Sequence, residues 1–190
     1  MNRIQVKLFS KLNVDAFEYV PVFHRWIRQR ELDELLIDVV DYSHVKHGPE
    51  VLLIGHESDY AIDRAMGKLG LLYAQKRPRS TSSNPWLTAL QRALHAAIKL
   101  ESETSPSVEL AFRTDELSLR VADRLLAPND EATYERLKPE LQSALGTMFG
   151  STSFSLTRAG TTRELFSVDI KAPGAPPLAE LLSRVAALPG

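Results

Sequence analysis

Residues 35–75 read LLIDVVDYSHVKHGPEVLLIGHESDYAIDRAMGKLGLLYAQ, a series of short apolar runs separated by residues that favour turns. The runs, each of strand length, are Leu35 to Val40, Val51 to Ile54, Tyr60 to Ile62 and Leu69 to Ala74. His47-Gly48-Pro49 and the glycine-containing segment Asp63 to Lys68 are typical turns. Because short connections join neighbouring strands that run in opposite directions, the pattern predicts an antiparallel meander.

Strand and helix periodicities continue on both sides of this meander. Ile4 to Phe9 alternates apolar and polar residues, as a strand with one buried face does. Helical spacing runs from about Val14 to Glu31, and we expect Pro21 to open the main helix rather than to break the region into two short ones. Asn84 and Pro85 predict the start of another helix. Its apolar stripe comprises Trp86, Leu87, Leu90, Leu94, Ala97 and Ile98.

The second half of the chain predicts hairpins and helices as well. Val108 to Phe112 and Leu117 to Val121 alternate on either side of Thr114-Asp115-Glu116, which we interpret as the turn of a hairpin. A helix should start at Pro128-Asn129-Asp130 and reach about Met148, with Pro139 kinking it or delaying its start. The remaining predicted elements are a hairpin of Phe154 to Leu156 with Leu165 to Ile170, and a terminal helix over Leu178 to Ala187.

Together these elements predict an α+β fold in which an antiparallel β-meander and hairpins pack against three to four helices. The chain contains neither GxGxxG nor GxxxxGK[ST], so the sequence does not favour a Rossmann or P-loop nucleotide-binding fold. We expect a single domain over residues 1–190. A two-lobed organisation, with 1–100 and 107–190 joined by the polar segment 101–107, stays open.

Composition restricts the class of protein. A content of 23 Lys+Arg against 24 Asp+Glu gives a formal net charge of −1, which disfavours duplex nucleic acid as a partner because duplex-binding proteins usually carry a basic excess. The absence of cysteine excludes disulfides, thiolate nucleophiles and cysteine-ligated metal sites. No apolar run approaches the roughly 18 residues of a membrane span, and the N-terminal residues have no signal-peptide pattern. We therefore predict a cytoplasmic protein without a membrane partner.

Four stretches resemble those of a set of uncharacterised bacterial proteins of similar length. They are YVPVFHRWI at 19–27, VLLIGHESDY at 51–60, GLLY at 70–73 and DRLLAPN at 123–129. The resemblance spans most of the chain and implies a bacterial cytoplasmic origin. It implies no activity, cofactor or catalytic residue.

The segment from Asp38 to Asp63 is the richest in side chains that can bind metals or transfer protons. Divalent metals are held by imidazole nitrogens and carboxylate oxygens, so His44, His47 and Asp41 are candidate metal ligands. The alternative is a solvated turn in which both histidines are exposed. A divalent metal therefore stays open, and no other cofactor is predicted.

The candidate catalytic residues are His56, Glu57 and Asp59. His56 follows the apolar run Val51 to Ile54, and the end of a strand is a common position for a general base because the scaffold fixes the backbone there. Asp59 or Asp41 could form an acid–base pair with it, whereas consecutive strand residues such as His56 and Glu57 point to opposite faces. The alternative is a histidine hydrogen-bonded to a neighbouring backbone group.

A third candidate site lies on the first helix, where His24, Arg25 and Arg28 could bind an anionic ligand. Guanidinium groups beside the indole of Trp26 suit the recognition of phosphate or carboxylate. The alternative is a solvated helix face that is paired with nearby carboxylates such as Glu31, Asp33 or Glu34. Trp86, in contrast, leads an apolar stripe and should pack in the core or at a dimer interface.

Two functions follow from these candidates. We favour a binding module, either monomeric or homodimeric, that recognises a protein partner or a small anionic ligand. The alternative is a small enzyme, metal-assisted or based on a histidine–carboxylate pair, that uses the region 38–63. The sequence does not determine which of the two it is.

Overall fold

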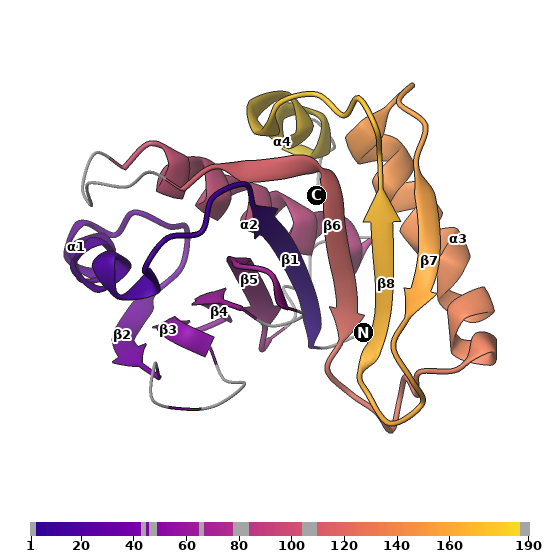
Figure 1. Ribbon diagram of the computed structural model, residues 1–190, viewed down its shortest axis with the longest axis horizontal. Coiled ribbons are helices and arrows are strands. Elements are labelled where there is room, and N and C mark those ends of the chain that lie inside the picture. Colours follow the sequence, from indigo (N-terminus) through magenta and orange to yellow (C-terminus); the bar gives the residue numbers. More distant parts are fainter. Residues whose placement is uncertain are drawn as a thin grey trace.

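The computed structural model describes residues 3–42, 45, 49–64, 67–77, 84–103 and 110–186. In this part of the chain eight strands form one sheet in the order β2-β3-β4-β5-β1-β6-β8-β7 (Figure 1). The strands are β1 (Ile4–Ser10), β2 (Leu36–Asp41), β3 (Pro49–Gly55), β4 (Ser58–Asp63), β5 (Gly70–Gln75), β6 (Phe112–Val121), β7 (Ser155–Ala159) and β8 (Phe166–Lys171). All neighbours in the sheet are antiparallel, so the meander of the first half is confirmed.

Four α-helices in the described residues complete the α+β fold that the sequence predicts. They are α1 (Val20–Gln29), α2 (Pro85–Glu101), α3 (Glu131–Phe149) and α4 (Leu178–Ala186), and a 3-10 turn, η1 (Ala16–Tyr19), precedes α1. Figure 1 shows α2 and α3 behind the sheet, with α4 above them. None of the helices in the described ranges is long and apolar enough to cross a membrane.

The hydrophobic core lies between the helices and one face of the sheet. Ile4, Val6 and Leu8 of β1 are all buried and share one cluster with buried residues of the four helices, among them Trp86 of α2. Side chains alternate between the two faces of a strand, so the intervening residues of β1 point to the opposite face. We call that opposite face, which the helices do not cover, the open face.

The local signals at the helix starts act as the sequence predicts. The Asn84 side chain accepts a hydrogen bond from the backbone N–H of Trp86 at 3.0 Å, and Asp130 accepts one from that of Thr133 at 2.8 Å. Each capping oxygen satisfies an N–H that has no partner within the helix. Pro21 lies in the first turn of α1. Of the two effects predicted for Pro139, the delayed start of α3 is wrong, because the helix begins at Glu131 and continues through the proline. A kink at Pro139 stays a prediction.

The hairpin predicted around Thr114-Asp115-Glu116 is also wrong, because this segment lies inside the continuous strand β6. It contains no Gly, Asn or Pro to bend the chain, and Arg113 forms an ion pair with Asp115, a residue on the same side of an extended strand. The polar residues instead mark an irregular register. Leu8 of β1 opposes Leu117, whereas Ser10 opposes Phe112.

Some sequence predictions fall outside the described residues. These are the candidate metal ligands His44 and His47, most of the turn His47-Gly48-Pro49, the centre of the turn Asp63 to Lys68, the start of the predicted strand at Val108, Ala187 at the end of the last helix, and the greater part of the polar segments 76–85 and 101–107.

Candidate functional site

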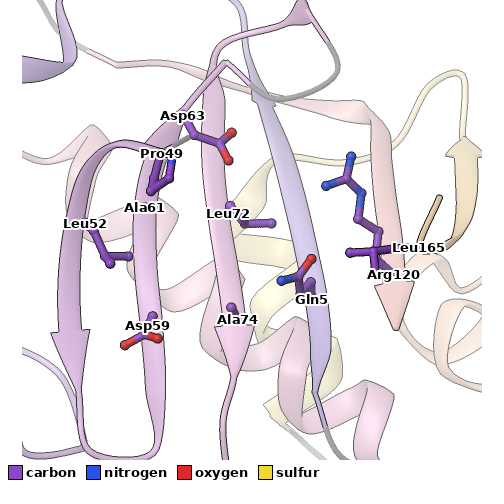
Figure 2. A pocket seen from close by; sticks show the side chains of 10 residues that line it. All are labelled: Gln5, Pro49, Leu52, Asp59, Ala61, Asp63, Leu72, Ala74, Arg120 and Leu165. Atoms are coloured by element: carbon purple, nitrogen blue, oxygen red, sulfur yellow. The ribbon is translucent and has the colours of Figure 1, made fainter. Parts of the chain in front are cut away.

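The open face of the sheet carries a groove with a volume of about 330 Å³. Its lining residues come from β1, β3, β4, β5 and β6 and from the segment before β8 (Figure 2). They are Gln5, Pro49, Leu52, Asp59, Ala61, Asp63, Leu72, Ala74, Arg120 and Leu165. A volume near 300 Å³ is at the lower end of the range for small-molecule sites.

Strand pairing places the open-face residues in rows that run across the strands. One row consists of Leu52, Ala61, Leu72, Lys7, Ser118 and Asp169, each directly opposite the next on the neighbouring strand. The adjacent row consists of Ile54, Asp59, Ala74, Gln5, Arg120 and Ser167. These two rows are therefore apolar over β3, β4 and β5, apart from Asp59, and polar over β1, β6 and β8.

Arg120 is the cation that lines the polar end of this groove. Within the described ranges it forms no ion pair, and its Nε atom is buried without a hydrogen-bond partner. Burial lowers the pKa of Arg120, while the charges of Asp169 and Glu164 raise it. Arginine keeps its proton in proteins under all ordinary conditions. The groove therefore contains a partly buried positive charge that no ion pair with another described residue neutralises.

Two further polar atoms close to Arg120 in the sheet are buried without a partner in the described part of the chain. They are the Ser118 hydroxyl oxygen and Asp169 Oδ1, which belong to residues directly opposite each other on β6 and β8. Buried polar atoms are normally hydrogen-bonded, because an unpaired one costs about 1–3 kcal/mol. This part of the open face therefore has unused hydrogen-bonding capacity beside a positive charge.

Lys7 and Asp63 form a buried ion pair on the same face. The Lys7 ammonium contacts the Asp63 carboxylate and donates to the Asp63 backbone carbonyl at 2.8 Å. Burial, followed by the nearby Arg120 charge, lowers the pKa of Lys7 to about 7. Lys7 is fully buried and is not among the residues that line the groove, so a ligand in the groove would not contact it directly.

The structure places the three candidate catalytic residues in different surroundings. The exposed ring of His56 contacts the Arg77 guanidinium, and the Glu57 carboxylate accepts from Arg92 at 2.8 Å on the helix side. Asp59 accepts from Lys76 at 2.6 Å and lines the groove. Among the hydrogen bonds and ion pairs seen between described residues, none joins the His56 ring to the Glu57 or Asp59 carboxylate.

Glu57 belongs to a buried network of hydrogen bonds next to the β3–β4 turn. The Glu34 carboxylate, whose side chain is 1% exposed, accepts from the backbone N–H groups of Glu57 and Ser58 at 2.9 and 3.0 Å. It also accepts from the Tyr60 hydroxyl at 2.8 Å and from Arg92 at 3.0 Å. Burial and the Glu34 charge raise the pKa of Tyr60. All these groups satisfy one another, so the network fixes the turn rather than offering a site.

The candidate anion-binding residues of the first helix lie on α1, away from the open face. Arg25 forms an ion pair with Glu103, and the same carboxylate accepts from the Trp26 indole at 2.6 Å. His24 and Arg28 are exposed. The indole and one of the three cationic residues are therefore already engaged with a carboxylate.

The candidate metal site is only partly visible, because Asp41 is described and its proposed co-ligands His44 and His47 are not. Asp41 is an exposed residue at the end of the edge strand β2. In the described ranges no group of three or more His, Asp or Glu residues is arranged so that it could hold a metal ion.

Neither a protein-family model nor a curated protein matches the chain. Sequence reasoning missed Arg120, Gln5 and Asp63 as groove residues. The alternation of Leu117, Leu119 and Val121 assigns Arg120 to the polar face of its strand. It does not show that this face lies beside Gln5, more than a hundred residues away in the sequence.

Proposed function

We propose that the protein is a binding module that takes a small anionic ligand in the open-face groove. The observation that carries the proposal is Arg120, a partly buried cation that lines the groove without an ion-pair partner in the described residues. A guanidinium that has already lost part of its hydration gains more from an incoming carboxylate or phosphate than an exposed one does. Gln5, directly opposite Arg120 on β1, adds an amide that can donate to the same anion.

The charges around Arg120 favour one anionic group. The carboxylates of Asp59 and Asp63, which also line the groove, have cationic partners in Lys76 and Lys7. These ion pairs reduce the field of both carboxylates in the groove. Arg120 is then the lining charge without an ion-pair partner among the described residues, and Asp169 and Glu164 reduce its field. A ligand with a single negative charge matches this distribution.

The enzyme alternative has weaker support. Asp59 is the one candidate catalytic residue that lines the groove, and His56 and Glu57 contact other groups. The candidate sites at His24, Arg25 and Arg28 and at His44, His47 and Asp41 stay predictions, as do a bacterial origin, a cytoplasmic location, a protein partner and a homodimeric state.

Octanoate is a suitable probe, with octylammonium as a control of equal length and opposite charge. We expect octanoate to bind with amide NMR shifts on β1 and β6, and octylammonium not to bind there. A hydrogen bond to a charged group contributes about 1.5–3 kcal/mol, so Arg120→Ala should weaken octanoate binding at least tenfold. Arg113→Ala is the matched control, because Arg113 lies on the same strand but is paired with Asp115.

Two results would overturn the proposal. One is equal binding of octanoate to the wild type and to Arg120→Ala in calorimetric titration. The other is equal affinity for octanoate and octylammonium, which would show that the groove recognises apolar surface without regard to charge.

A further inference from the structure

The two ends of the open-face groove differ in chemistry. The end at β1 and β6 presents Gln5 and Arg120, which are directly opposite each other. From β5 to β3 the groove is lined by Leu72, Ala61 and Leu52, which follow one another in a single row. Figure 2 shows Arg120 and Leu52 on opposite sides of the groove, with β4, β5 and β1 between their strands.

The length of the groove follows from the sheet order. β6 and β3 are separated by β1, β5 and β4, so the groove spans four strand spacings. At about 4.8 Å per spacing, the backbones of β6 at Arg120 and of β3 at Leu52 are about 19 Å apart across the sheet. A compact anion would contact the polar end alone and leave the apolar row in water.

The apolar row is itself unusual for a face without helices. Ala61 is buried, and Leu52 and Leu72 are partly buried, although none of the helices in the described residues covers them. A ligand segment that lies along these side chains removes more apolar surface from water, and the gain is about 0.8 kcal/mol for each fully buried methylene group. Asp59 and Asp63 lie on either side of the row, and each forms an ion pair with a lysine.

We propose that the ligand is an elongated amphiphile, with one carboxylate or similar anionic head at Gln5 and Arg120 and an unbranched apolar tail laid across β5, β4 and β3. This inference rests on the proposed function, because it uses the same groove and the same arginine. It adds the shape of the ligand and assigns Leu72, Ala61 and Leu52 to its tail. A fatty acid anion has the required chemistry.

The test is a chain-length series of butanoate, octanoate and dodecanoate, measured by calorimetric titration below the micelle-forming concentration. One side of the tail stays in water in an open groove, so we expect affinity to rise about twofold per methylene, below the value for full burial. Leu72→Thr keeps a strand-forming residue but removes apolar surface. It should weaken dodecanoate binding at least fivefold and leave butanoate binding unchanged.

Leu125→Thr is the control for non-specific adsorption, because Leu125 is 95% exposed and lies in the loop between β6 and α3. It should leave the whole series unchanged. Loss of dodecanoate binding in this variant would overturn the inference, since the tail would then bind outside the groove. Retained binding and a retained thermal unfolding transition support it.

The series also distinguishes a failure of the elongated-ligand inference from a failure of the anion-binding function. If butanoate and dodecanoate bind equally and both lose affinity in Arg120→Ala, the elongated ligand is wrong and the anion-binding function survives. If none of the three acids depends on Arg120, both fail. A length dependence that persists in Arg120→Ala and disappears in Leu72→Thr would retain the tail site and reject the anionic head.

Discussion

Lys7 lies at the centre of the sheet, where a charged residue is least expected. Both members of its ion pair with Asp63 are almost fully buried. Removing one partner of a buried pair leaves an uncompensated charge and costs about 3–5 kcal/mol, whereas replacing both by apolar residues is often neutral. We expect Lys7→Met and Asp63→Leu each to lower the free energy of unfolding strongly, and the double variant to recover most of the loss. Urea unfolding of the four proteins tests this, and additive losses would contradict it.

The same lysine should make stability depend on pH. Burial and the Arg120 charge lower the pKa of folded Lys7 from 10.5 to about 7, so between these values the unfolded chain binds more protons than the folded one. Stability must then rise with pH, by up to about 1.4 kcal/mol per unit. We expect a steeper rise from pH 7 to pH 9 in the wild type than in the double variant Lys7→Met/Asp63→Leu. Parallel curves would show that Asp63 keeps Lys7 charged throughout this range.

Residue patterns predicted which residues are buried better than they predicted contacts. The apolar stripe of α2 correctly placed Trp86 in a buried position. The sequence pattern indicates Glu34 only as a surface partner of the first helix, yet it is the buried acceptor for the β3–β4 turn and for Arg92. Its partners lie 23 to 58 residues away, and no periodicity links positions at such separations.

At the scale of elements, alternation and capping signals were sufficient wherever one face of a strand is buried and a cap is present. The strands of the first half and the starts of α2 and α3 confirm this. The failure at Thr114-Asp115-Glu116 has a specific cause. Polar residues in a row resemble a turn, but Glu116 pairs with Lys171 of β8, and the Asp115 carbonyl accepts a hydrogen bond from the Ala172 N–H at 2.8 Å. These contacts hold the segment along β8 as part of an extended strand.

Two glycines should respond in opposite ways to the same substitution. A Cβ at Gly70 in β5 would lie 2.1 Å from the backbone oxygen of Leu8, so Gly70→Ala must push β5 away from β1. We expect it to lower the free energy of unfolding by about 3 kcal/mol or more. A Cβ at Gly146 in α3 meets nothing within 4 Å, so Gly146→Ala should raise that free energy by about 0.5–1 kcal/mol. Chemical denaturation measures both, and two changes of the same sign would contradict the argument.

At the scale of the whole molecule, the N-terminal strand joins the two halves of the chain. β1 lies between β5 of the first half and β6 of the second, so the sheet is continuous from β2 to β7. The helix layer is continuous as well, because α2 packs against both α3 and α4. The ligand groove depends on this arrangement, since Leu52 belongs to one half and Arg120 to the other.

This arrangement predicts that the halves do not fold separately. In a fragment of residues 106–190, β6 would lose its partner β1 and the α3–α4 pair would lose α2, leaving an unpaired edge and an exposed apolar surface. We expect fragments 1–105 and 106–190 each to lack a cooperative urea transition by circular dichroism, and an equimolar mixture to regain one. Octanoate binding should return only in the mixture, because the groove needs residues from both fragments. A cooperative transition of 106–190 alone, with its amide NMR shifts unchanged by the partner fragment, would instead support two lobes that fold independently.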